Sequence, residues 1–135
     1  MAKTFTLDIY TPYNHYYSDD VEYLQVCSEK YMLGILPNHS PLVSTVVISE
    51  LVIQKDGKRE SYATSGGLIK VNDNKVELLL QSIESVDEID LDRAKAAKER
   101  ALKRLATPKL ETIKITASKL ALARAENRIN IKNKK

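Results

Sequence analysis

The apolar residues of this 135-residue chain change their spacing once, near Ser85. Before that point, short runs rich in Val, Ile, Leu, Thr and Tyr are interrupted by turn residues about every eight to twelve positions, as in antiparallel sandwiches and barrels. After Ser85 the spacing approaches the helical period of about 3.6 residues. We therefore predict an α+β chain, mainly β, with an antiparallel β-sandwich at residues 1–85 and a C-terminal α-helical hairpin at residues 86–135.

The strands of the first segment are separated by clear turn signals. Asp56-Gly57 and, less strongly, Asp73-Asn74 predict type I′ turns, because these residues tolerate the positive φ that both central positions need. We interpret Ser65-Gly66-Gly67 as a bulge or tight bend entering a strand, since no helix follows to form a phosphate-binding loop. Strands are expected at residues 5–10, 21–28, 32–36, 42–49, 50–55, 60–65, 67–73 and 75–85.

The first helix has several N-cap candidates, including Ser85 and Asp90. It should end at Thr107-Pro108, because proline cannot continue the hydrogen-bond ladder and disfavours a helical residue before it. The second helix is expected from about residue 110 to 129, followed by a polar tail that frays.

Each helix carries a predicted inner stripe. The stripe of the first is mostly alanine, which allows close approach of a second helix, and a basic ridge lies beside it. The stripe consists of Leu91, Ala94, Ala97, Ala101 and Leu105, and the ridge of Arg93, Arg100 and Arg104. The stripe of the second helix consists of Leu110, Ile113, Ala117, Leu120 and Ala121, with Arg124 and Arg128 at its centre.

Arg124 and Arg128 occupy positions where the pattern calls for leucine. Either they extend their charged ends to water, or they meet an anion such as phosphate or carboxylate, which suits the planar guanidinium group. A second apolar row on the same helix, Ile115, Leu122 and Ile129, has seven-residue spacing. Two separate rows favour a helix that packs in two alternative ways.

The charges are divided between the two segments. Residues 1–88 hold 7 Lys/Arg and 13 Asp/Glu, a balance of −6, whereas residues 89–135 hold 14 and 5, a balance of +9. Such an asymmetry points to an anionic partner for the helical segment, either nucleic acid or an acidic protein surface.

No catalytic or metal-binding constellation is found. His15 and His39 have no companion ligands at suitable spacing, and the single Cys27 is interpreted as a small core residue in a reducing compartment. No apolar run reaches the ~20 residues that span a bilayer, and the N-terminus lacks a signal-peptide pattern. We therefore expect a cytoplasmic protein, which could still lie against a membrane by binding something embedded there.

Three stretches in this order resemble the epsilon subunit of bacterial F-type ATP synthase. They are "LGILPNHSPLV" (33–43), "SGGLIKV" (65–71) and "IDLDRA" (89–94). The resemblance covers essentially the whole chain and implies a non-catalytic subunit of the rotating central stalk, peripheral to the cytoplasmic face of the plasma membrane. It implies a sandwich between the gamma subunit and the c-ring, and a hairpin that folds down or extends to acidic loops of the beta subunits and inhibits ATP hydrolysis.

The resemblance also implies ATP as a regulatory ligand that holds the folded hairpin, with no metal cofactor. Its binding residues would be Glu84, Ile89, Asp90, Arg93, Ala94, Arg124 and Arg128. Contacts with the c-ring or gamma would involve Tyr31, Pro37, His39 and Pro41. Asn38 stands where the family usually has glycine, which asparagine tolerates because it adopts left-handed conformations.

Two other functions are compatible with the residues. A nucleic-acid-binding protein could use residues 89–135 as a basic arm, although the acidic sandwich argues against this. A stand-alone ATP sensor acting in solution would use the same ATP residues without the motor.

Overall fold

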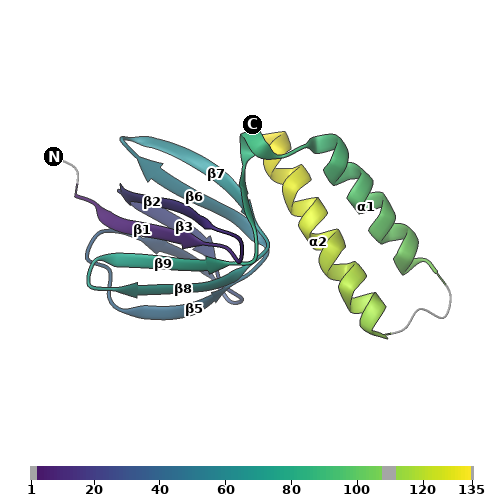
Figure 1. The fold of residues 1–135 in the computed structure, drawn as a ribbon, viewed down its shortest axis with the longest axis horizontal. Helices are drawn as coiled ribbons and strands as arrows, with labels where there is room; N and C mark the ends of the chain where they lie inside the picture. Colours follow the sequence, from purple (N-terminus) through teal and green to yellow (C-terminus); the bar gives the residue numbers. More distant parts are fainter. Residues whose placement is uncertain (1–2, 108–111, 135) are drawn as a thin grey trace. The chain divides into compact units, whose positions relative to one another are not determined.

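The computed structural model describes residues 3–107 and 112–134 and divides the chain into two compact units, Met1–Ser85 and Val86–Lys135. The first unit is a β-sandwich and the second is a pair of helices lying side by side (Figure 1). The mainly β architecture followed by a helical hairpin confirms the predicted fold class.

Two five-stranded sheets make up the described part of the sandwich. The first has the order β2-β1-β9-β8-β5, and the second has the order β10-β7-β6-β3-β4. The strands are β1 Phe5–Tyr10, β2 His15–Val21, β3 Tyr23–Cys27, β4 Met32–Ile35, β5 Leu42–Val46, β6 Ser49–Lys55, β7 Lys58–Thr64, β8 Gly67–Asn72, β9 Lys75–Leu80 and β10 Ile83–Ser85.

Alternate residues of the strands point into the space between the sheets and form one hydrophobic core. On β1 these are Phe5, Leu7 and Ile9, all buried. They meet buried residues of the opposite sheet such as Leu24 and Leu51 within the same cluster. The outward positions of the first sheet are thereby left available for other contacts.

The predicted turns are present. Asp56 and Gly57 have φ of 52° and 75°, and Asp73 and Asn74 have φ of 50° and 58°, as type I′ turns require. Gly67 enters β8 as expected for a tight bend, and a Cβ atom there would lie only 1.9 Å from the carbonyl oxygen of Leu79. Only glycine fits this close backbone approach.

Several strand predictions need correction. Residues 15–20, which lay outside every predicted strand, belong to the edge strand β2, and the predicted strand 75–85 is two strands in different sheets, β9 and β10. Strand β5 ends at Val46 rather than at residue 49. One pair, β1 with β9, is parallel, although every other pair is antiparallel in the described sheets.

The helical unit begins with a 3₁₀ turn, η1 Val86–Glu88, followed by α1 Leu91–Leu105 and α2 Thr112–Lys134. Helix α1 ends two residues before Thr107, close to the predicted stop. The predicted fraying of the C-terminal tail is wrong, because α2 continues to Lys134. Ile131 is buried, and the Nζ atom of Lys132 donates a 2.8 Å hydrogen bond to the carbonyl oxygen of Val86, so the end of α2 is fastened to η1.

The outer face of β1 carries a buried carboxylate, Asp8. Its oxygens lie 2.9 Å from Nε2 of His15 and 3.8 Å from Nζ of Lys75. A side-chain hydrogen bond from Ser18, its register partner on β2, is the main influence holding the pKa of Asp8 below its usual value. His15 and Lys75 act in the same direction, against burial, which raises the pKa.

We predict that Asp8→Asn reduces the acid sensitivity of folding. Because the folded-state pKa of Asp8 is lowered, its contribution to stability is present above the unfolded value of about 3.9 and is lost as the pH falls through the folded value. The measurement is the free energy of urea unfolding from pH 7 to pH 2.5. The variant should show a shallower loss below about pH 4. Parallel curves for the two proteins would contradict this assignment.

Candidate functional site

The two helices of the hairpin pack through small side chains. Ala94 and Ala101 are the buried residues of α1, and both belong to the predicted stripe. On α2 the buried positions are Ser118, Ala125 and Ile131. The seven-residue spacing of the small pairs 94/101 and 118/125 is that of a close, coiled-coil-like seam.

The predicted inner stripe of α2 is wrong at Ala117 and Leu120. Ala117 and Leu120 are exposed, whereas Ile115, Leu122 and Ile129, the predicted second row, are half-buried beside the Ser118–Ala125 seam. Ala121 is half-buried, Leu110 lies outside the described residues, and nothing is described of the Ile113 side chain. The hairpin buries alanine and serine while leaving Leu102 and Leu120 more than 40% exposed, at 41% and 45%.

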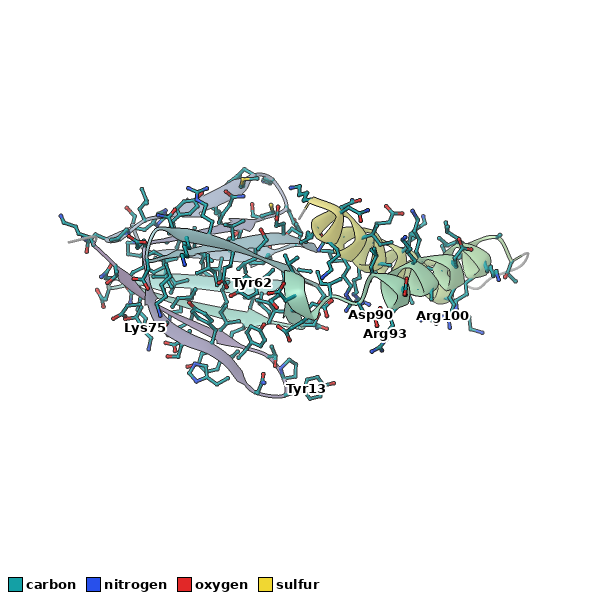
Figure 2. The ribbon with its side chains drawn as sticks, turned by 90° about the horizontal axis from the view of Figure 1, so that it is seen from above. Tyr13, Tyr62, Lys75, Asp90, Arg93 and Arg100 are labelled. Atoms are coloured by element: carbon teal, nitrogen blue, oxygen red, sulfur yellow. The ribbon has the colours of Figure 1, made fainter. Side chains whose placement is uncertain are left out.

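Asp90 is the N-cap of α1. Its backbone is extended, with φ −91° and ψ 106°, and its carboxylate accepts a 3.1 Å hydrogen bond from the backbone N–H of Arg93. This satisfies one of the N–H groups that a helix leaves free at its start. Ile89 and Ala94 flank the cap and are buried. Figure 2 shows Arg93 and Arg100 on α1, on the C-terminal side of Asp90. Both side chains are exposed, as is that of Arg104 in the same ridge.

Arg124 and Arg128 are half-buried on α2. The Nε atom of Arg124 is buried and has no hydrogen-bond partner in the described structure. A buried N–H without an acceptor is costly, and a guanidinium group meets phosphate or carboxylate with paired hydrogen bonds. Arg124 is thus the side chain of the hairpin best prepared to receive an anion.

The predicted ATP residues fall in both units. Ile89, Asp90, Arg93, Ala94, Arg124 and Arg128 belong to the helical unit, whereas the half-buried Glu84 belongs to β10 of the sandwich. The assignment of these seven residues to one ATP site stays a prediction.

The predicted partner-contact residues lie in loops of the sandwich. Tyr31, immediately before β4, is 56% exposed. Pro37 and His39 are half-buried and Pro41 is exposed, in the connection between β4 and β5. There Asn38 has φ of 63°, as the left-handed expectation requires, and the N–H of His39 donates to the carbonyl oxygen of Leu36 at 3.2 Å. A proline at the second position of the turn, here Pro37, and a positive φ at the third, here Asn38, are typical of a type II turn.

The sequence analysis did not predict the apolar outer surface of the first sheet. Leu68 of β8 and Leu79 of β9 are register partners, both about half exposed, and Leu79 pairs on its other side with Tyr10. With Pro12 they line a shallow groove of about 390 Å³. The available signal was the unbroken runs "LI" and "LLL", which indicate strands covered on both faces.

Among the residues that the structure describes, no cluster of three or more His, Cys, Asp or Glu side chains is arranged to hold a metal ion. No helix there has the length and apolar character needed to cross a membrane.

The chain thus combines a β-sandwich that has an exposed apolar face with a basic helical hairpin that has a half-buried arginine pair. The family models for the ATP synthase delta/epsilon chain match nearly the whole chain, the beta-sandwich domain at residues 4–86 and the long alpha-helix domain at residues 87–133. The chain belongs to this family, and within it to the bacterial F-type epsilon subunits.

Curated relatives support the assignment along the full length. The chain is 44% identical over 130 residues to the ATP synthase epsilon chain of Desulfitobacterium hafniense strain Y51, covering 96% of this chain and 97% of the relative. It is 40% identical over 131 residues to that of Bacillus licheniformis, covering 96% and 98%. The nucleic-acid-binding alternative is not supported by these relatives.

Solved structures show the same fold. A chain of the mitochondrial ATP synthase OSCP/F1/c-ring structure from Euglena gracilis superposes with a TM-score of 0.81 at 21% identity, covering 92% of this chain and 78% of that chain. A chain from the Tetrahymena thermophila ATP synthase central stalk/c-ring structure gives 0.64 at 13% identity, covering 96% and 97%.

We predict that Asp90→Ala destabilises the hairpin by about 1 kcal/mol, because the N-cap hydrogen bond to Arg93 is lost. Asp90→Ser keeps a capping oxygen and should stay within a few tenths of a kcal/mol of the parent. The measurement is urea unfolding of the full chain followed by helical circular dichroism. Equal loss in both variants would show that the carboxylate stabilises through its charge and not through the cap.

Proposed function

We propose that the chain is the subunit of the bacterial motor that binds gamma and the c-ring through its sandwich and restrains ATP hydrolysis through its hairpin. In this role it has no catalytic step of its own. It is peripheral to the cytoplasmic face of the plasma membrane because its partners are held there.

The sandwich offers two surfaces for such contacts. The apolar groove of Tyr10, Pro12, Leu68 and Leu79 suits gamma, because an exposed apolar patch on a sheet is stabilised by covering it. The loops that carry Tyr31, Pro37, His39 and Pro41 suit the c-ring or gamma.

The hairpin is proposed to be an ATP-responsive brake. The observation that carries this proposal is the buried Nε of Arg124, which has no hydrogen-bond partner among the described residues, on the helix whose Ser118 and Ala125 form the seam. A triphosphate bound by Arg124 and Arg128, with Ile89, Asp90, Arg93 and Ala94 completing the site, would stabilise the folded hairpin. Without it the helices would extend, place Leu102 and Leu120 against another helix, and bring the basic ridge to acidic loops of the beta subunits.

We predict that truncation after residue 88 accelerates ATP hydrolysis by the assembled enzyme at least about fivefold, because the brake is removed. The measurement is steady-state hydrolysis by the complex reconstituted with full-length or truncated chain. Co-elution of the truncated chain with gamma serves as the control for assembly. Equal hydrolysis rates for the two complexes, each with its chain at full occupancy, would contradict the inhibitory role.

We predict that Arg124→Ala weakens ATP binding by about 10-fold or more, because a charge-assisted hydrogen bond is lost. Lys119→Ala is the matched control, since it removes the same charge from an exposed position of α2. The measurement is calorimetric titration of the full chain with ATP, with and without magnesium. The same affinity in both variants would remove Arg124 from the site. ATP binding without co-elution with gamma would favour a stand-alone sensor.

A further inference from the structure

We propose that Asn74 is a positioning residue that sets the shape of the loop between β4 and β5 for partner binding. The inference rests on the proposed role of that loop, with Pro37, His39 and Pro41, as a contact of the sandwich. Asn74 lies 36 residues after Asn38 of that loop, in the type I′ turn between β8 and β9.

The side chain of Asn74 joins three segments. Its Oδ1 accepts a 2.8 Å hydrogen bond from the backbone N–H of Asn38 in the loop. Its Nδ2 donates a 3.0 Å hydrogen bond to the carbonyl oxygen of Thr4, just before β1. The orientation of the amide is fixed by chemistry, because an N–H needs an acceptor and a carbonyl oxygen needs a donor.

The backbone of Asn74 is also held by a hydrogen bond. The N–H of Thr6 donates to its carbonyl oxygen at 3.2 Å, and its φ of 58° belongs to the turn. The side chain is therefore held on a rigid element on its own side and reaches the loop as a preorganised acceptor.

The bond to Asn38 selects the turn type. Type I and type II turns differ by a flip of the central peptide, here the one between Pro37 and Asn38, so its N–H points in opposite directions in the two forms. An acceptor placed on one side favours one form. Asn74 thereby favours the positive φ of 63° at Asn38 and fixes the direction in which Pro37 and His39 leave the turn.

The asparagine at position 38 makes this support more valuable than glycine would. A left-handed conformation is sterically less favourable for asparagine than for glycine, which has no Cβ atom. Without Asn74 the peptide would lose the acceptor that offsets this cost. The loop would then populate other turn forms, and a partner would have to select the competent one.

Asn74→Gly is the first test, because glycine adopts the positive φ of the turn and removes both side-chain bonds. The Asn38 amide should exchange with solvent about fivefold faster in the isolated full chain, as expected for one lost hydrogen bond. Binding to a purified gamma–c-ring complex should weaken by a similar factor, with circular dichroism unchanged. A destabilised fold would instead accelerate exchange throughout the sandwich.

Two matched variants separate the bonds. Asn74→Asp keeps the acceptor for Asn38 and loses the donor to Thr4, so exchange at Asn38 and binding should return to near the parent values. Asn38→Gly keeps the donating N–H and the left-handed backbone, so binding should change by less than about twofold. Unchanged Asn38 exchange in Asn74→Gly, or faster exchange with unchanged binding, overturns the proposal. Absence of binding by the parent chain instead overturns the proposed function and leaves the exchange result to decide the Asn74 bond.

Discussion

The structure of the sandwich depends on the contact between the inner faces of its two sheets. Strand β1 is at the centre of this constraint, since it pairs with β2 on one side and with β9 on the other while its alternate residues fill the core. Because Phe5, Leu7 and Ile9 must face inward, Asp8 and Tyr10 must face outward. The same alternation that buries the core thus places a buried carboxylate and the edge of an apolar groove on the opposite face.

At the open edge formed by β2, Asp19 shares a face with Leu7, and its carboxylate is paired with Lys55 across the sheets. Inward charges at such an edge discourage pairing with other chains.

Much of the sandwich is predictable because its signals are local. Period-two runs located most strands, and the Asp56-Gly57 and Asp73-Asn74 turns set their antiparallel partners. Strand β2 could not be found this way, because "HYYSDDV" is a polar edge strand whose inward residues are Tyr17, Asp19 and Val21. The break between β9 and β10 and the parallel pairing of β1 with β9 were also missed, since both depend on distant segments and not on local pattern.

The candidate site was predicted in part, for a related reason. Capping chemistry pointed to Asp90, and helical spacing placed Arg124 and Arg128 among apolar positions. The structure shows Asp90 as the N-cap and both arginines half-buried. The face of α2 was misassigned because hydrophobicity favoured Leu120 and Ala117 over Ser118. In a close helix seam, small size matters more than hydrophobicity, so a buried serine and an exposed leucine are compatible with good packing. The support that Asn74 gives to Asn38 is invisible in sequence, since it joins residues far apart through one amide.

The small residues of the seam have an energetic consequence for the proposed brake. Each buried methylene contributes about 0.8 kcal/mol, so alanine and serine at four seam positions stabilise the hairpin by several kcal/mol less than leucines would. In the proposed brake, the free energy of the folded hairpin would then lie only slightly below that of an extended one. A charge-assisted hydrogen bond to Arg124 contributes about 1.5–3 kcal/mol, and about 5.5 kcal/mol is enough to carry a two-state equilibrium from 1:99 to 99:1. Two or three such bonds from one polyanion would therefore supply a free energy of the size that the proposed switch needs. A seam of large apolar residues would have made the folded hairpin too stable to respond.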